Sequence, residues 1–414
     1  MIDWPTSTGT RVPGTGSIGG SAARRRCEDS ACSPDQSTVH SRIRHHVITH
    51  AQQRQEAGVH ARVHIPRRRG RLWLAMGCGA STAAPPPAST GGGTATEARP
   101  SHAEPALPQG SGMSEWRRCA PTCVGRIQRA LDSIARSNEE LNACIEVLKE
   151  DALRLATEAD KRLASGAKPR PLEGMPLLVK CNIDLAGSLS TAGTAGLANW
   201  RPADNAAIVA KLLEHGAICV GKTNMPECAM GWWGYNKLHG PCRNPRDLGA
   251  TCGGSSAGTA AGIAASMAPV GLGSDTMGSL RTPSECCGIS GFRPSHGRYP
   301  TTGVVPLSTT EDTPGPMGKT VADVAVLDAL IVGEPLDSVV PAPLHGVVFC
   351  APSDWIEELD PGARAALDTT ITALKAAGAT VRTDLAFKQV SEYKTDAKGN
   401  YAGLELQKYS DSHP

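Results

Sequence analysis

Short, almost wholly apolar runs alternate with helical patterns over most of this chain, and that alternation limits the folds open to it. Residues 175–179, 217–220 and 269–272 suit buried strands and are too short for helices. Elsewhere apolar residues recur three or four positions apart, as over 124–134. Strands that alternate with helices form a parallel or mixed sheet, because each connection crosses back over the sheet. The sequence therefore predicts an α/β domain with a mixed central sheet flanked by helices.

Further helices are expected from periodicity and from end signals. Apolar residues over 152–163 predict a second helix. Asp204 and Asn205 are the expected N-caps of the next helix, which ends at Gly216. A helix of small residues follows residue 258, and a capping box over 320–323 predicts the start of one more.

Residues 1–112 differ from the rest in composition. Residues 1–75 contain 12 Arg, no Lys and 5 acidic residues, and residues 76–112 consist largely of Gly, Pro, Ala, Ser and Thr. Such a segment buries too little apolar surface to offset the entropy lost on ordering. The sequence predicts a disordered low-complexity tail over 1–112 and one domain over 113–414, which is expected to be truncated at its C-terminus.

The tail leaves several interpretations of location open. Residues 76–81 (MGCGAS) fit an N-myristoylation pattern, so a lipid anchor is expected only if translation starts at Met76. The Arg-rich head leaves organelle targeting, a nucleic-acid-binding arm or an incorrectly extended gene model as alternatives. No run reaches the roughly 18 apolar residues of a membrane span. The net charge of +2 argues against general nucleic-acid binding, and a cytoplasmic location is favoured.

The 14 cysteines show no metal-binding pattern. Cys119 and Cys123 form one close pair, and Cys286 and Cys287 form another. Neither pair has a matching Cys or His pair at zinc-site spacing. We therefore expect reduced, mostly structural cysteines in an intracellular protein, with no metal and no cofactor.

Two familiar motifs occur in settings that do not suit them. Residues 216–223 match the phosphate-binding P-loop pattern, but the four residues after Gly216 form an apolar strand instead of a loop. Residues 254–258 match the G-x-S-x-G nucleophile elbow, but no hydrophobic strand leads into them. His296 and His345 remain as bases for a Ser-His-Asp esterase, which stays an alternative.

The most informative residues are two Gly- and Ser-rich segments, 253–259 (GGSSAGT) and 273–281 (GSDTMGSLR). Glycine lets the backbone approach a ligand closely and adopt positive φ. Successive N–H groups before Ser279 could bind an oxyanion. Composition alone also allows two ordinary serine-rich turns.

These segments resemble the signature of the amidase signature family, whose members cleave amides with a Ser–cis-Ser–Lys triad. The resemblance extends from about residue 115 to the C-terminus and includes 174–180 (GMPLLVK), 221–227 (GKTNMPE), 303–306 (GVVP) and 312–317 (DTPGPM). It implies that Ser279 is the nucleophile, that Ser255 follows a cis peptide bond and transfers a proton, and that Lys180 is the base. A base lysine must be neutral, so its pKa should be lowered by burial.

The resemblance also implies two supporting sets of residues. The oxyanion would be bound by backbone N–H groups of Thr276, Met277, Gly278 and Ser279. Further support would come from Ser256, Asp275 and Arg281.

The implied activity is that of a serine amidohydrolase, which releases acid and ammonia from a small carboxamide through an acyl-enzyme. Residues 292–300 and 312–317 look more like indoleacetamide or mandelamide hydrolases than like the A subunit of the tRNA-dependent amidotransferase, so an aryl-acetamide is the favoured substrate. Trp232, Trp233 and Tyr235 either line an aromatic pocket or pack in the core, and packing is favoured. The implied partner is a small-molecule amide, and homo-oligomerisation is left open.

Three positions depart from the family pattern. Met277 stands where Gly or Ala is usual and would be strained if φ were positive there. Cys181 replaces an Asp, and Ala257 replaces a Gly. The second hypothesis is therefore a catalytically impaired amidase-like binding or subunit protein.

Overall fold

A computed structural model of the 414-residue chain describes residues 112–336, 339, 342–357 and 359–385. Of the tail predicted over 1–112, residues 1–111 lie outside the described residues, and so do the acylation pattern at 76–81 and residues 386–414. Gly112, which the composition assigned to the tail, is buried and begins helix α2 (Gly112–Cys119). Its backbone N–H donates to Oδ2 of Asp323 at 2.9 Å, which anchors α2 to helix α8 (Val321–Val332).

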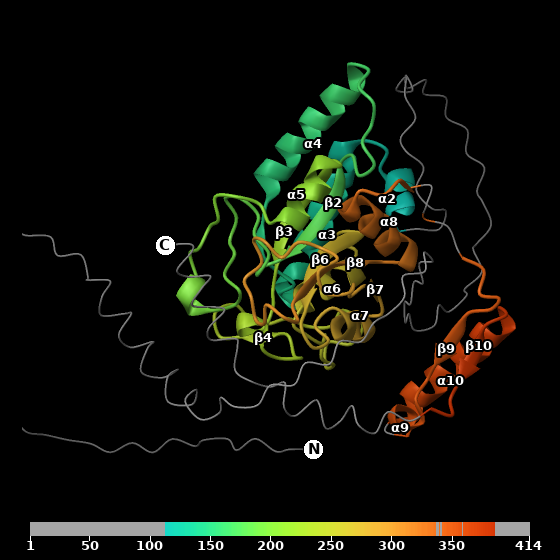
Figure 1. The fold of residues 1–414 in the computed structure, drawn as a ribbon. Coiled ribbons are helices and arrows are strands. Elements are labelled where there is room, and N and C mark those ends of the chain that lie inside the picture. Colours follow the sequence, from blue (N-terminus) through green and yellow to red (C-terminus); the bar gives the residue numbers. More distant parts are fainter. Residues whose placement is uncertain (1–111, 337–338, 340–341, 358, 386–414) are drawn as a thin grey trace, which may run out of the picture. The chain divides into compact units, whose positions relative to one another are not determined.

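A six-stranded mixed sheet forms the centre of the domain, with strand order β1-β3-β2-β6-β8-β7 (Figure 1). Its strands are β1 (Cys144–Val147), β2 (Met175–Lys180), β3 (Ala217–Thr223), β6 (Val270–Asp275), β7 (Ser290–Gly291) and β8 (Thr313–Gly318). β2 pairs in parallel with both β3 and β6, whereas β1, β7 and β8 run antiparallel to their neighbours. The three predicted apolar strands are these parallel strands.

Helices pack against this sheet as predicted. They are α3 (Cys123–Leu141), α4 (Lys149–Ala164), α5 (Ala207–Glu214), α6 (Ala257–Ala264), α7 (Arg281–Cys287) and α8. α3 packs against α4 and β2, α5 against α8 and β3, and α6 against β2 and β6. Small residues let α6 approach closely, because a Cβ on Gly258 would lie only 2.2 Å from the carbonyl oxygen of Ala143.

The predicted helix start is confirmed at α8 and wrong at α5. At α8, Thr320 Oγ1 accepts the N–H of Asp323, and the Asp323 carboxylate accepts the N–H of Thr320, which completes the capping box. At α5 the N-cap is Ala206 instead of Asp204 or Asn205, and it makes no side-chain cap. Asn205 Oδ1 instead accepts a backbone N–H from the loop after β2, so a tertiary contact takes the side chain that was expected to cap the helix.

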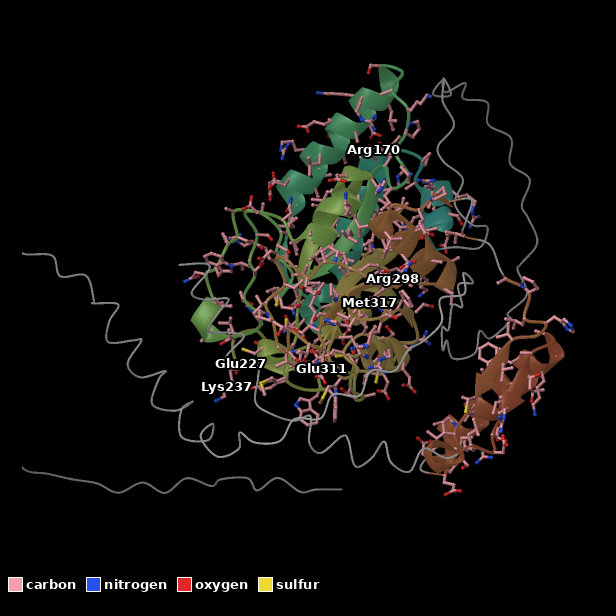
Figure 2. All side chains as sticks on the ribbon, in the orientation of Figure 1. Arg170, Glu227, Lys237, Arg298, Glu311 and Met317 are labelled. Atoms are coloured by element: carbon pink, nitrogen blue, oxygen red, sulfur yellow. The ribbon has the colours of Figure 1, made fainter. Side chains whose placement is uncertain are left out.

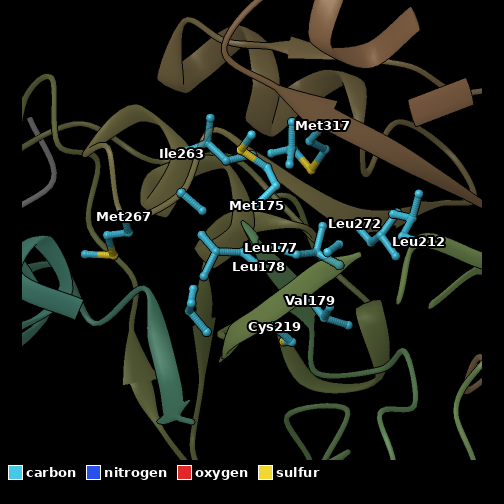
Figure 3. Packing of buried hydrophobic residues seen from close by; sticks show 14 of the residues in the cluster. Met175, Leu177, Leu178, Val179, Leu212, Cys219, Ile263, Met267, Leu272 and Met317 are labelled. Atoms are coloured by element: carbon cyan, nitrogen blue, oxygen red, sulfur yellow. The ribbon is translucent and has the colours of Figure 1, made fainter. Parts of the chain in front are cut away.

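The hydrophobic core lies on both sides of the sheet. Every residue of β2, β3 and β6 is buried. Figure 3 shows part of this core, which includes Met175, Leu177, Leu178, Val179, Leu212, Cys219, Ile263, Met267, Leu272 and Met317. Because both faces of the strands are covered, they carry continuous apolar runs instead of an alternation.

The remaining described elements do not belong to the six-stranded sheet or to the helices that pack on it. They are β4 (Tyr235–Asn236), β5 (Gly240–Pro241), β9 (Val348–Cys350), α9 (Ser353–Ile356), α10 (Pro361–Ala376), β10 (Thr380–Arg382) and the 3₁₀ turns η2 (Ala195–Leu197) and η3 (Glu227–Ala229). β9 and β10 pair in parallel, and α10 has no buried residue. Of the helices in the described part of the chain, none is long and apolar enough to cross a membrane.

Candidate active site

Two parallel strands end at the same edge of the sheet and carry polar residues there. β2 ends at Lys180 and β6 ends at Asp275. The loop before α6 brings Ser255 to this edge, where Nζ of Lys180 donates to Oγ of Ser255 at 2.7 Å. The segment after β6 carries Ser279, whose carbonyl oxygen accepts the N–H of Ser256 at 3.1 Å. The fold therefore gathers the three segments that carry the predicted triad.

The Lys180 side chain is completely buried. Burial disfavours the ammonium form and lowers the pKa of Lys180 to about 7, although nearby groups that include Asp275 and Asp312 act in the opposite direction. Besides Ser255, Nζ contacts Oγ of Ser274 at 2.9 Å and the carbonyl oxygen of Ser274 at 3.4 Å. An amine with this pKa is largely neutral just above pH 7 and can accept a proton from the hydroxyl that it contacts.

Ser255 is fully buried in a tightly packed loop. The Gly254–Ser255 peptide bond is cis, which is the form that the resemblance implies. A Cβ on Gly254 would lie 2.8 Å from a backbone carbonyl oxygen and 3.0 Å from the carbonyl carbon of Trp232, so only glycine fits. The hydroxyl of Ser256 donates to the carbonyl of Ser274 and accepts its N–H, which fastens the loop to β6.

Asp275 organises the loop that carries Ser279. Its buried carboxylate accepts the backbone N–H groups of Gly278 at 2.7 Å and of Leu280 at 3.0 Å. Arg281 adds hydrogen bonds from Nε and Nη2. Burial by itself would raise the pKa of Asp275, but hydrogen bonds from Arg281 and the backbone outweigh it and lower the pKa. The carboxylate is therefore ionised near neutral pH and fixes the turn before α7.

The N–H groups of this turn differ in availability. The N–H of Gly278 is bonded to Asp275, so it is not free to bind an oxyanion in this structure. Among the residues that the structure describes, the N–H groups of Met277 and Ser279 and the hydroxyl of Ser279 make no hydrogen bond. Positive φ falls on Gly278 (132°) and not on Met277, so the strain considered for Met277 does not arise.

Neighbouring residues hold this turn from the other side. The hydroxyl of Thr276, which was predicted to contribute an oxyanion donor through its N–H, donates to Oδ1 of Asp312. Nε of Arg293 lies 3.1 Å from Oδ1 of Asp275. The sequence pointed to no role for Ser274, Asp312 or Arg293. All three lie inside segments that the family resemblance includes, 273–281, 292–300 and 312–317. That location was the one sign in the sequence that they could contribute to the site.

The P-loop pattern at 216–223 belongs to a strand, as predicted. Lys222 is fully buried in β3 and cannot reach a phosphate in solvent. Its Nζ donates to the carbonyl oxygen of Ile183 and to Oγ of Ser190. Burial lowers the pKa of Lys222 as well.

The G-x-S-x-G pattern at 254–258 places Ser256 in the position of an elbow nucleophile. Its hydroxyl is buried and bonded to the backbone of β6. His296 and His345 are exposed, and within the described residues neither bonds Ser256. The geometry therefore does not favour a Ser-His-Asp arrangement.

Trp232, Trp233 and Tyr235 are exposed, which corrects the expectation that they pack in the core. Their exposed fractions are 52%, 66% and 50%. Trp232 lies against both serine-bearing segments. Its backbone covers Gly254, and its Nε1 lies 4.0 Å from the position that a Cβ on Gly278 would take.

Charged side chains occur at both ends of the domain. Figure 2 shows Glu227, Lys237 and Glu311 toward the end that carries β4, whereas Arg170 lies at the opposite end. Glu311 directly precedes Asp312, so the first of these ends is the one that carries the site. No group of three His, Cys, Asp or Glu residues in the described ranges is placed to hold a metal ion.

Comparison with known proteins places these features in a family context. The family model described as Amidase matches residues 126–393. The chain is 43% identical to mandelamide hydrolase from Pseudomonas putida over 251 residues, which cover 59% of this chain and 49% of that protein. It is 37% identical to one subunit of the glutamyl-tRNA(Gln) amidotransferase from Clostridium acetobutylicum over 270 residues, which cover 62% and 56%. The chain spans about half the length of these curated relatives.

Solved structures show the same likeness. One described as an amidase is 31% identical, with a TM-score of 0.65, and the match covers 73% of this chain and 69% of that chain. The native peptide amidase from Stenotrophomonas maltophilia is 29% identical, with a TM-score of 0.65 and coverage of 74% and 68%. These matches confirm the predicted α/β fold with a mixed central sheet.

Proposed function

Because this chain belongs to the amidase family, we propose that it is a serine amidohydrolase that cleaves the C–N bond of a small carboxamide to a carboxylic acid and ammonia. The observation that carries the proposal is the 2.7 Å contact between Nζ of Lys180 and Oγ of Ser255 in a completely buried setting. We further propose that residues 113–414 belong to this one domain.

In the first step, the hydroxyl of Ser279 attacks the amide carbonyl carbon. Its proton passes to Oγ of Ser255, whose own proton passes to Nζ of Lys180. The lowered pKa of Lys180 supports this step, because the lysine must be neutral beforehand and an ammonium afterwards. Ser274 supports it too, because its hydroxyl and carbonyl oxygens lie beside Nζ.

Negative charge then develops on the former carbonyl oxygen. The N–H groups of Thr276, Met277 and Ser279 are the proposed donors to this oxygen, since that of Gly278 is held by Asp275. Asp275 acts as a positioning residue, because its hydrogen bonds to the turn set where these N–H groups lie.

Collapse of the tetrahedral intermediate breaks the C–N bond. The proton held by Lys180 returns through Ser255 to the leaving nitrogen, which departs as ammonia and leaves an ester on Ser279. A water molecule then adds to the ester carbonyl and gives one proton to the same relay. The bond between the acyl carbon and Oγ of Ser279 breaks, the acid is released, and the relay returns the proton to Oγ of Ser279. Each proton accepted by Lys180 is thus returned within the cycle.

An aryl-acetamide is the proposed substrate class. The similarity to a mandelamide hydrolase supports it, as does the exposure of Trp232 beside the serine-bearing segments. The competing hypothesis is a non-catalytic binding or subunit protein of this family. The engagement of the Gly278 N–H favours that hypothesis, because it leaves fewer oxyanion donors than the family resemblance implies.

Covalent labelling tests the proposal directly. We expect a fluorophosphonate probe to modify Ser279, and peptide mapping by mass spectrometry locates the adduct. Ser279→Ala should abolish labelling and ammonia release from phenylacetamide. Ser133→Ala is the matched control, since Ser133 is a buried serine on α3 that bonds the carbonyl of Ala265. Folded protein that is neither labelled nor active would favour the non-catalytic hypothesis.

A further inference from the structure

Trp232 connects the two segments that carry the candidate serines. Its backbone carbonyl carbon would lie 3.0 Å from a Cβ on Gly254, the residue before Ser255. Its indole Nε1 would lie 4.0 Å from a Cβ on Gly278, the residue before Ser279. Trp232 therefore borders both segments, Gly254 with its backbone and Gly278 with its indole, and about half of its surface, 52%, is in solvent.

A second apolar side chain stands on the same turn. Met277 directly precedes Gly278 and is 55% exposed. Covering an exposed indole or thioether group with an apolar ligand removes apolar surface from water and lowers the free energy. Stacking between aromatic rings lowers it further. A small polar amide would leave the Trp232 and Met277 side chains uncovered and would not bring this stabilisation.

We infer that Trp232 and Met277 form the surface that binds an aromatic acyl group of the substrate and so favours aryl over small aliphatic amides. For turnover, this assignment rests on the proposed hydrolase function. For binding it does not, because the surface exists whether or not Ser279 reacts. Trp232 borders the Gly278 turn of the candidate site. The ligand that covers it is therefore assigned as a ligand of this site and not as a second protein.

The neighbouring tryptophan provides a matched control. Trp233 is 66% exposed, and its Nε1 lies 3.7 Å from the position of a Cβ on Gly231. It has the same side chain as Trp232 and is also exposed, but it packs over the backbone of its own loop. If the loss of any surface aromatic side chain weakened binding, Trp232→Ala and Trp233→Ala would both do so. A specific role of Trp232 predicts weaker binding in Trp232→Ala alone.

Binding is measured in the Ser279→Ala background, so that the answer does not depend on turnover. Calorimetric titration with phenylacetamide should give a Kd that Trp232→Ala raises by about 10-fold, that Trp232→Phe largely restores and that Trp233→Ala leaves unchanged. Met277→Ala should raise it by a smaller factor. An unchanged Kd in the Trp232→Ala variant, or an equal increase in Trp233→Ala, would overturn the assignment.

Turnover provides the second readout in the Ser279 protein. Trp232→Ala should lower kcat/KM for phenylacetamide by about 10-fold and leave that for propionamide nearly unchanged. Equal losses for both substrates would mean that Trp232 only supports the loop, and the assignment would be wrong. Inactive protein that still binds phenylacetamide through Trp232 would refute the proposed function and keep this assignment.

Light scattering distinguishes a protein occupant. If a second copy of the chain covered this surface, Trp232→Ala would shift the oligomeric state and leave the Kd for phenylacetamide unchanged. That result would contradict the assignment to substrate.

Discussion

Nζ of Lys180 lies 2.7 Å from Oγ of Ser255, although the two residues are 75 positions apart in the sequence. Lys180 reaches this contact because β2 ends at the same sheet edge as its parallel neighbour β6. Both side chains are completely buried. The contact therefore joins a potential base to a hydroxyl where burial favours the neutral amine.

The pH dependence of activity should follow the neutral fraction of Lys180. Because burial lowers the pKa of Lys180 to about 7, kcat/KM for phenylacetamide should rise as the pH is increased through 7 and level off above it. Lys180→Arg should be inactive across this range, because a guanidinium keeps its proton. Stopped assays of ammonia between pH 5 and 9 provide the measurement. Activity that is flat or falls through pH 7 would contradict a role for neutral Lys180.

Asp275→Asn should loosen the turn that carries Ser279. The amide keeps the size of the side chain but loses the charge that faces the Arg281 guanidinium and three backbone N–H groups. We expect the free energy of unfolding in urea to fall by about 2 kcal/mol and the labelling rate of Ser279 to fall as well. Asp247→Asn is the control, because the exposed Asp247 carboxylate accepts the nearby N–H of Gly249, and a change within about 0.5 kcal/mol is expected there. Equal losses at both positions would refute a special role for Asp275.

Gly278→Ala should impair the site more than an ordinary glycine substitution. Gly278 has φ of 132°, and a Cβ there would lie 3.0 Å from Oγ1 of Thr282. Gly297 also has positive φ, 79°, but nothing lies within 4 Å of its Cβ position. Gly297→Ala should cost about 1–2 kcal/mol of unfolding free energy and leave labelling of Ser279 intact, whereas Gly278→Ala should also slow labelling. Identical labelling rates in the two variants would contradict this account.

Gly258→Ala should destabilise the packing of α6. The new methyl group would lie 2.2 Å from the carbonyl oxygen of Ala143, so the helix that follows Ser256 would have to move. A loss of about 3 kcal/mol in a urea titration is expected. In Gly262→Ala on the same helix, the methyl meets a terminal methyl of Leu178 at 2.6 Å, which can rotate away. Gly262→Ala should therefore lower the free energy of unfolding less than Gly258→Ala does. The reverse order would contradict the importance of the backbone contact at Gly258.

The fold was predictable where a local pattern matched the final environment. The parallel strands are buried on both faces, so their apolar runs identified them in advance. β8 carried no such signal. Pro314 and Pro316 each lack a backbone N–H, and antiparallel pairing with β6 and β7 makes this segment a strand. The N-cap of α5 failed for a related reason, because Asn205 bonds a distant backbone group instead.

The residue types of the candidate site could be predicted from the sequence, but many of the contacts between them could not. The motif resemblance identified Lys180, Ser255 and Ser279 as residues that should meet, and the fold brings their segments to one edge. It did not reveal the contact of Ser274 with Nζ of Lys180. Nor did it reveal that Asp275 occupies the N–H of Gly278. Such contacts depend on which strand ends lie side by side, and spacing along the chain does not encode that order.

The sequence by itself determined the α/β class and the central apolar strands, and it pointed to the serine and lysine residues of the candidate site, because periodicity and motif chemistry are local properties. The tertiary structure decided the burial that lowers the pKa of Lys180, the partners of Asp275 and the exposure of Trp232. Burial and hydrogen-bond partners depend on what neighbouring segments leave uncovered or unpaired. Trp232, for which core packing was the favoured expectation, thus lies on the surface beside Gly254 and Gly278.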